Sequence, residues 1–402
     1  MNLFTYFGLT PEEFNERYVN TGLVRVNNHN EFPLSIYNYS RKCVQEKVWD
    51  SVTSKCRGII ARQDNHEVIA RPFDKFHNYG AEPGWGNTTF VPTDEPVVWE
   101  KIDGFMCTLY TWDGVDYFAS KGSFHSTHAK WATAQLRKKW DQTMPFREEG
   151  YTYVFEGLCP DLRIVVNYKN RQELILLAII NNDTGEEFSP EQLQYVGRCT
   201  QFTTPELSDM LMKEVVHSTG ITETQVADNG NIESKVVNEE GFVLTWYRPG
   251  QTPFRLKLKF IEYLRLYRLV TNVSPKHIWE VLRDGLTSEM DEYINNSTPG
   301  FAKFVQKWAK AMTAEYKRLA TEATIRYVTV KETVRVKVGQ RPYENLGTER
   351  KAWALEFQRP ENKEFASILF AMLDGKNIEP IIWKQIKPMT KDANPLVNGF
   401  AY

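Results

Sequence analysis

From about Asn30 to Phe260 the chain is dominated by short runs of β-branched and aromatic residues, which Gly, Asp and Asn turns separate. The clearest runs are EVIARPF, PVVWEKI, CTLYTW, TYVFEGL, RIVVNY, ELILLAII, EGFVLTW and FRLKLKF. Two stretches in the same region, 127–140 and 205–216, have apolar residues at helical spacing. The pattern predicts a sheet-rich α+β domain with a few helices packed on its sheets.

Helical patterns flank this region on both sides. Thr10-Pro11-Glu12-Glu13 is typical of a helix start, with Thr as N-cap, Pro at the first position and Glu13 reaching back to the cap. After about Leu264 the pattern becomes mostly helical, and apolar residues from Phe301 to Leu319 form one stripe. Because 402 residues exceed one ordinary core, we expect two domains, 1–265 and a helical 266–402.

Composition indicates a folded protein of a reducing compartment. Hydrophobic residues make up 42% of the chain and aromatic residues 13%, which is ample core material. The five cysteines are scattered and never form a C-x-x-C pair, which argues against a disulfide framework or a zinc site. The first residues lack a signal-peptide pattern, and the most apolar run, Leu174 to Ile180, is too short for a membrane span. We therefore expect a cytoplasmic protein with no membrane partner, in the host cytoplasm if the chain is viral.

The net charge of −2 conceals a basic segment near the C-terminus. Residues 301–360 contain 13 basic and 6 acidic residues, enough positive charge to neutralise phosphates. Four of the lysines share one face of the expected helix, namely Lys303, Lys307, Lys310 and Lys317. A solvated polar face is the simpler interpretation, and RNA contact is the alternative.

Lys101-Ile102-Asp103-Gly104 places a lysine where the apolar run ending at Trp99 gives way to a tight turn. K-x-D-G is the signature of covalent nucleotidyltransferases, although so short a motif also arises by chance as a β-turn beside a surface lysine. A lysine attacks phosphorus only as a neutral amine, so nearby cations or burial must lower its pKa. The cations available for this, and for the charge on phosphoryl oxygens, are Arg57, Lys75, Lys121, Lys257 and Lys259.

Two of these lysines and two glutamates have positions that suit a site on a sheet. Lys257 and Lys259 alternate with leucines, so in a strand both amines point to one face, which could equally be a solvated one. Glu156 ends the run YVFE before a glycine, and Glu240 precedes Gly241. Carboxylates at such positions suit Mg²⁺ or a ribose hydroxyl. The alternative is that each glutamate is a surface turn residue.

Eight segments in order resemble the RNA ligase 1 family, typified by the enzyme of T-even bacteriophages. These segments are IYNYSRK, KCRGII, ARPFDKFHN, EKIDG, ASKGS, VFEGLCPDLRIVVNY, EEGFVLTW and RLKLKF, spread over about residues 34–260. The resemblance implies that Lys101 becomes adenylated, that Glu156 contacts the ribose and that Glu240 helps to place a metal ion. It also implies that the five cations grip ATP phosphates or the RNA 5′-phosphate, with Gly104 among the nucleotide-binding residues.

Several further residues remain candidates for this site. They are Asp103, Tyr37, His77 and Arg163. His77 departs from the family, in which a Phe follows the Lys-Phe pair that is Lys75-Phe76 here. Tyr37, Tyr39 and Trp246 could stack on bases, but aromatic residues in strands usually belong to the core.

The position of the arginine separates the related classes. DNA ligases and capping enzymes usually carry Arg or Lys two residues after the motif glycine, where this chain has Met106. Arg57-Gly58 upstream resembles the RNA ligases instead. The alternatives are a DNA ligase or capping guanylyltransferase on the same core, or an inactive RNA-binding relative.

The resemblance thus predicts an ATP-dependent RNA ligase with Mg²⁺, or Mn²⁺, as its metal. The expected fold is a two-sheet nucleotidyltransferase domain followed by a mostly α-helical domain. The substrate would be RNA with a 5′-phosphate and a 3′-hydroxyl. The family's helical C-terminal domain is associated with tRNA recognition, which points to repair of a broken tRNA anticodon loop.

Overall fold

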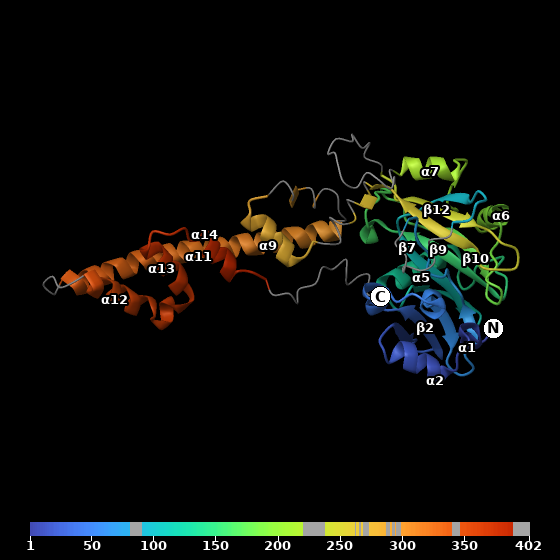
Figure 1. The fold of residues 1–402 in the computed structure, drawn as a ribbon, viewed down its shortest axis with the longest axis horizontal. Helices are drawn as coiled ribbons and strands as arrows, with labels where there is room; N and C mark the ends of the chain where they lie inside the picture. Colours follow the sequence, from blue (N-terminus) through green and yellow to red (C-terminus); the bar gives the residue numbers. More distant parts are fainter. Residues whose placement is uncertain are drawn as a thin grey trace. The chain divides into compact units, whose positions relative to one another are not determined.

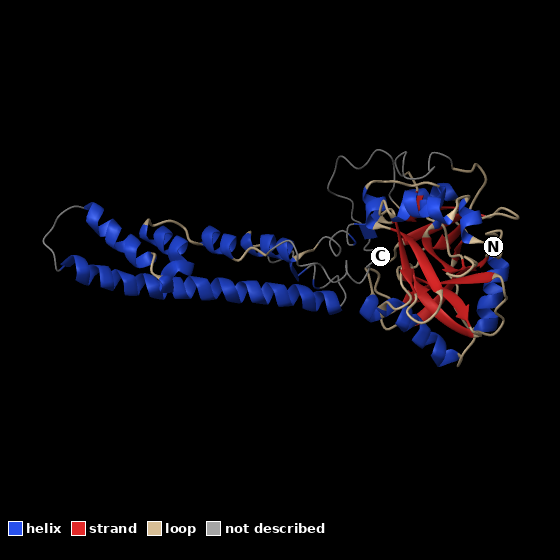
Figure 2. Ribbon diagram, turned by 90° about the horizontal axis from the view of Figure 1, so that it is seen from below, coloured by secondary structure: helices blue, strands red, loops and turns tan. Residues whose placement is uncertain are grey.

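The computed structural model describes residues 1–80, 91–219, 238–261, 263–264, 267, 273–286, 290–291, 294, 299–339 and 346–388. The chain divides into two compact units, residues 1–268 and residues 269–398. The expected boundary at residue 265 lies beside this division. Strands belong to the first unit, and the described residues of the second form only helices and loops (Figure 2). The α+β class with a helical C-terminal region is confirmed.

The first sheet is antiparallel and has the order β1-β2-β3-β4. Its strands are β1 (Val24–Asn28), β2 (Leu34–Tyr39), β3 (Arg57–Arg62) and β4 (Val68–Ala70). One face packs on the N-terminal helices α1 (Leu3–Phe7), α2 (Pro11–Phe14) and η1 (Asn15–Val19). Its other face packs on the second sheet, and α3 (Arg41–Gln45) and α4 (Ser51–Lys55) connect β2 to β3. The predicted cap is confirmed, because Thr10 Oγ1 accepts from the Glu13 amide and Glu13 Oε2 accepts from the Thr10 amide.

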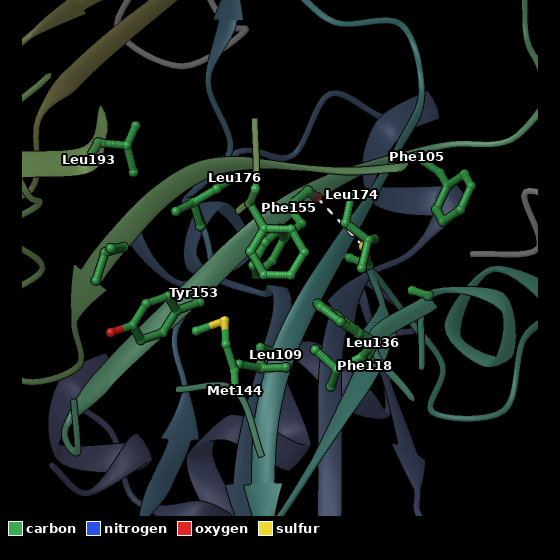
Figure 3. Close-up of a cluster of buried hydrophobic side chains, with 14 of the residues drawn as sticks. Phe105, Leu109, Phe118, Leu136, Met144, Tyr153, Phe155, Leu174, Leu176 and Leu193 are labelled. Carbon is green, nitrogen blue, oxygen red and sulfur yellow. Dashed lines mark hydrogen bonds between the residues drawn. The ribbon is translucent and has the colours of Figure 1, made fainter. Parts of the chain in front are cut away.

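The second sheet has the order β10-β9-β7-β8 and contains the largest hydrophobic cluster. Its strands are β7 (Phe105–Trp112), β8 (Val115–Ser120), β9 (Tyr151–Leu158) and β10 (Glu173–Asn181), with a short turn η2 (Pro160–Leu162) after β9. Helices α5 (Thr127–Lys139) and α6 (Pro190–Thr200) supply Leu136 and Leu193 to this cluster, where they meet Phe118 and Phe155 (Figure 3). The predicted helix at 127–140 is therefore confirmed.

The third sheet has the order β11-β6-β12-β13-β5. Its strands are β5 (His77–Asn78), β6 (Val97–Glu100), β11 (Leu207–Ser208), β12 (Gly241–Trp246) and β13 (Phe254–Lys259). Helix α7 (Met212–Ser218) packs its Val215 against Leu244 and Leu256 on one face of this sheet, above β12 in Figure 1. Three sheets are thus present where we expected two, and the K-x-D-G turn connects the third sheet to the second.

One local prediction was wrong, a second was right only in part, and one helix was missed. RIVVNY is not a strand, because the amides of Val165 and Val166 donate to the Asp103 carboxylate instead of to a neighbouring strand. The stretch 205–216 starts with β11 rather than with a helix, since Leu207 pairs with Trp99 of β6. Helix α6 was not predicted, although Ser189 and Gln192 form a capping box at its start.

The second unit is built around one long helix. Its elements are α9 (Pro275–Arg283), α11 (Pro299–Gly339), α12 (Leu346–Phe357), η3 (Pro360–Phe365), α13 (Ala366–Leu373) and α14 (Glu379–Gln385). The predicted apolar stripe lies within α11, where Phe301 packs near Ile278 of α9 and Leu319 packs near Phe357. The four lysines of the predicted polar face are exposed. None of the helices that the described residues form has both the length and the apolarity that crossing a membrane requires.

Gly241 allows β12 and β13 to approach each other closely. Its φ is 140°, and a Cβ placed there would lie 2.1 Å from the carbonyl oxygen of Leu258 and 2.8 Å from Cα of Lys259. Only glycine avoids both the clash and the backbone strain. Gly114 also has a positive φ, 73°, but a Cβ there meets no atom within 4 Å.

We predict that Gly241→Ala lowers the free energy of unfolding by about 3 kcal/mol or more, because backbone strain and a clash with backbone atoms add up. Gly114→Ala, which has the strain alone, should cost about 1 kcal/mol. Thermal unfolding of both variants, followed by tryptophan fluorescence, measures the difference. Equal losses of stability would contradict the close approach.

Candidate active site

Lys101 lies in the turn that leaves β6, and the start of β12 holds this turn in place. The backbone amide of Lys101 donates to the carbonyl of Gly241 over 2.9 Å, continuing the pairing in which Phe242 faces Glu100. The Lys101 side chain is 19% exposed, so it is recessed yet open to a ligand. Sheet pairing, rather than the turn itself, thus sets the direction from which the lysine enters the site.

The Glu240 carboxylate binds two lysines at once. Its Oε2 lies 2.8 Å from Nζ of Lys101, and its Oε1 lies 2.6 Å from Nζ of Lys259. Glu240 precedes Gly241, which faces Lys259 across the β12–β13 pair. The predicted metal-binding carboxylate and the predicted nucleophile are therefore in direct contact, although 139 residues separate them.

These carboxylates hold the proton on Lys101. Burial favours the neutral amine, but the charges of Glu240 and Glu156 outweigh burial, so the pKa of Lys101 is raised above its ordinary value. We expected nearby cations to lower this pKa. Cations do have that effect at Lys257, whose pKa burial and the neighbouring Lys75 and Lys259 hold well below its usual range.

Asp103 of the K-x-D-G turn has a structural position. It is buried, its Oδ2 accepts from the amides of Val165 and Val166 over 2.9 and 2.7 Å, and its Oδ1 accepts from the Tyr263 hydroxyl over 2.8 Å. Burial and the charge of Glu240 raise the pKa of Asp103 to about 6, even though these hydrogen bonds favour its ionised form. The motif aspartate thus orders the chain around the lysine.

Because Gly104 has no side chain, the backbone of β9 can approach it closely, and this places Glu156 at the site. A Cβ at Gly104 would lie 2.4 Å from the carbonyl oxygen of Gly157 and 3.0 Å from Cγ of Glu156. Glu156 stands opposite Met106 in the β7–β9 pair. Burial raises the pKa of Glu156 to about 7, although the charge of Lys101 lowers it. Three carboxyl groups thus surround Lys101, namely Asp103, Glu156 and Glu240.

The predicted cations gather beside this group. We refer to Arg57, Lys75, Lys121, Lys257 and Lys259 as the cation cluster. Burial, with Arg57 and Lys121 nearby, lowers the pKa of Lys75 to about 8, and burial with Arg57 lowers the pKa of Lys121. Arg57 Nη1 lies 3.2 Å from the sulfur of Met106, and its guanidinium covers the ring of Phe76. So many cations at close range suit a ligand with several negative charges.

Tyr39 and Trp49 belong to this site, although sequence reasoning favoured the core for Tyr39 and missed Trp49. The Tyr39 hydroxyl lies 3.3 Å from Nζ of Lys121, and Trp49 contacts Tyr39 edge-on with Lys75 5.3 Å from its ring centre. Burial raises the pKa of Tyr39, but Lys121 and Arg57 outweigh burial and lower it. A bulge between Tyr37 and Asn38 interrupts the pairing of β2 with β3, so simple alternation could not place Tyr39.

The remaining candidates are divided between site and core. His77 is buried on β5, its ring lies 5.7 Å from that of Trp49, and burial with Lys75 and Lys257 lowers its pKa to about 4. Arg163 lines a small pocket beside Asp103 and Gly104. Tyr37 lies in the hydrophobic cluster under the N-terminal helices, packed on Phe14, and Trp246 is likewise buried. The structure does not bring Tyr37 to Lys101.

A K-x-D-G lysine among carboxylates and cations, in a turn between two β-sheets, is typical of the nucleotidyltransferase fold. The RNA ligase family model matches residues 55–263, which is 209 of the 402 residues and includes every member of both groups of charged residues. The chain belongs to this phage-type RNA ligase family, and it is an RNA ligase.

Individual relatives have low sequence identity to this chain. An RNA ligase of Rhodothermus phage RM378 is 25% identical over 405 aligned positions, covering 86% of each chain. RNA ligase 1 of bacteriophage TS2126 is 30% identical over 159, covering 35% of this chain and 39% of that one. Among solved structures, an archaeal ATP-dependent RNA ligase aligns with a TM-score of 0.45 at 14% identity, over 76% of this chain and 83% of that chain.

We predict that Glu240→Gln lowers the pKa of Lys101, because it removes the carboxylate that accepts from its ammonium and leaves the neighbouring cations. The rate at which Lys101 reacts with an amine-acylating reagent, followed by peptide mass spectrometry across pH, measures this pKa. Glu16→Gln, at an exposed position, is the control. An unchanged profile in Glu240→Gln would show that the ion pair does not govern Lys101.

Proposed function

We propose that this chain is an ATP-dependent RNA ligase that works through a lysyl-adenylate on Lys101. The Lys101 amine attacks the α-phosphorus of ATP and pyrophosphate leaves. AMP then passes to the 5′-phosphate of an RNA strand, and an RNA 3′-hydroxyl attacks that phosphate and displaces AMP. The observation that carries the proposal is the position of Lys101 between its carboxylates and the cation cluster.

The chemistry requires Lys101 to lose the proton that Glu240 and Glu156 stabilise. Glu240 is the carboxylate that would hold Mg²⁺ or Mn²⁺, and Glu156 is the one that would contact the ribose. Among the described residues no three His, Cys, Asp or Glu side chains form a metal-binding group, which fits an ion that takes few protein carboxylates and completes its shell with phosphates and water. When bound, the ion supplies positive charge that offsets the carboxylates and favours the neutral amine.

The cation cluster would hold phosphates in every step. Its lysines are crowded, so burial and mutual repulsion favour loss of a proton from Lys75 and Lys257. A triphosphate, or later an RNA 5′-phosphate, would restore their protons and be held by charged donors. The same residues can thus serve ATP first and RNA afterwards.

We assign RNA recognition to the helical unit and propose a tRNA broken in its anticodon loop as the substrate. Lys303, Lys307, Lys310 and Lys317 are exposed on α11, and within the described part of the chain none of them forms a salt bridge. Free ammonium groups along a helix can each neutralise a phosphate. The five cysteines are free thiols, which supports the cytoplasm, that of a host if the chain is viral, as the compartment.

We predict that Lys101→Ala and Lys101→Arg both lose labelling by ATP that carries ³²P at the α-position, because neither has an amine that can form the adduct. Circularisation of a 5′-phosphorylated single-stranded RNA should fall about a thousandfold or more. Lys101→Ala should still seal an RNA that already carries AMP on its 5′-phosphate, since that step needs no nucleophilic lysine. Intact circularisation by Lys101→Ala, labelling by GTP alone, or a preference for nicked duplex DNA would refute the proposal.

We predict that adenylation of Lys101 accelerates as the pH rises through 7. Lys101 loses its proton more readily as the pH rises, and the charge of Glu156 raises the pKa that this deprotonation must overcome. Glu156→Gln removes that charge and should shift the rise in rate toward lower pH, whereas Glu148→Gln, at an exposed position, should not. Single-turnover adenylation rates from pH 6 to 9 test this, and a rate that falls with pH would contradict it.

A further inference from the structure

A cleft of about 240 Å³ lies next to the cation cluster and shares two residues with the site described above. Lys75 and His77 line it on the β5 side, and Thr252 and Phe254 line it at the start of β13. Sites for drug-sized ligands occupy about 300–1,000 Å³. The cleft therefore suits a single small group, placed beside the cations that we propose hold phosphates.

Asp74 lies in this cleft without a partner. Its carboxylate forms neither a hydrogen bond nor an ion pair with any residue in the described part of the chain, whereas recessed carboxylates are normally paired. Burial raises the pKa of Asp74 despite the nearby charges of Arg71 and Lys55. The carboxylate is thus half-buried and lacks a hydrogen-bond donor among the described residues.

The hydrogen bonds of the cations around Asp74 run to other groups. The Arg71 guanidinium donates to Thr252 Oγ1 over 2.9 Å and to backbone carbonyls. Lys55 donates to the Tyr6 carbonyl over 2.9 Å. Arg255 forms a buried bidentate ion pair with Glu187. The protein thus surrounds the carboxylate with positive charge yet leaves its oxygens to an external donor.

The walls of the cleft indicate what kind of donor fits. Phe76 and Phe254 are half-buried aromatic residues on two sides of the cleft, and flat rings pack well on such walls. An Asp carboxylate reads a nucleobase by accepting from its exocyclic amino group, as from N4 of cytosine. A free phosphate is disfavoured, since it would face the Asp74 carboxylate.

We propose that this cleft binds the 5′-terminal nucleobase of the RNA strand that receives AMP, and that Asp74 accepts a hydrogen bond from the amino group of that base. The proposal rests on the proposed function, because the 5′-phosphate of that strand must lie at the cation cluster. Cytosine, adenine and guanine carry an amino group and uracil does not. The cleft thus makes the ligase discriminate against RNA that begins with uridine.

The test compares RNAs that differ only in the 5′-terminal base, cytidine or uridine, as acceptors of AMP from adenylated enzyme in a single turnover. We expect about tenfold faster transfer to the cytidine end. A third RNA that begins with N4,N4-dimethylcytidine has lost both amino hydrogens and should behave like the uridine RNA. This comparison uses the wild-type protein, so it does not depend on how a variant folds.

Asp74→Asn should bring the cytidine-to-uridine ratio to within about twofold, because an amide can turn to present either an acceptor or a donor. Asp64→Asn, at an exposed carboxylate in the turn between β3 and β4, is the control and should keep the wild-type ratio. Equal rates for all three RNAs, an unchanged ratio in Asp74→Asn, or selectivity only at the 3′-terminal base of the acceptor strand would overturn the proposal. If adenylated wild-type enzyme transfers AMP to no RNA, the proposed function itself fails.

Discussion

The Glu240 carboxylate, shared between Lys101 and Lys259, is the interaction on which the rest of the site depends. It lies at the boundary between two kinds of charge, with Glu156 and Asp103 on one side and the cation cluster on the other. The carboxylate and the two ammonium groups compensate one another's charge, whereas any of the three buried alone would be costly. Lys101 is thus protonated in the site without ligand, and the proposed chemistry requires that a ligand change this balance.

Close backbone approaches bring these charges together from distant parts of the chain. Gly241 lets β12 meet β13 at Lys259, and Gly104 lets the K-x-D-G turn meet β9 at Glu156. Gly58, at a φ of 98°, lies where a Cβ would come within 2.9 Å of the backbone oxygen of Lys121, and so it joins the first sheet to the second beside Arg57. Each of these glycines adjoins or faces a charged residue of the site, so the fold and the chemistry depend on the same positions.

Much of this arrangement could be predicted from the sequence, because it follows from local rules. The alternation of residues predicted that Lys257 and Lys259 lie on one face of a strand and Leu256 and Leu258 on the other. The Thr10 capping box and the apolar stripe of α11 also follow from residues that are near one another in the sequence. What failed was non-local. RIVVNY has the composition of a strand, but the backbone amide of Val165 donates to Asp103, which lies 62 residues earlier in the chain. A bulge in β2 likewise takes Tyr39 out of the alternating pattern. The raised pKa of Lys101 could not be foreseen either, because it depends on how near two carboxylates lie in space.

The protonation of Lys101 and that of the cation cluster should respond in opposite ways to a phosphate ligand. Around Lys101 the carboxylates favour the protonated amine, while crowding makes Lys75 and Lys257 readier to lose a proton than free lysines. A polyphosphate would recharge the crowded lysines, and positive charge arriving with it would weaken the hold of Glu240 on Lys101. Binding would therefore move protons toward the lysines that we propose hold phosphate and away from Lys101, the proposed nucleophile. Because Glu240 contacts both Lys101 and Lys259, we expect this carboxylate to couple phosphate binding to deprotonation of Lys101.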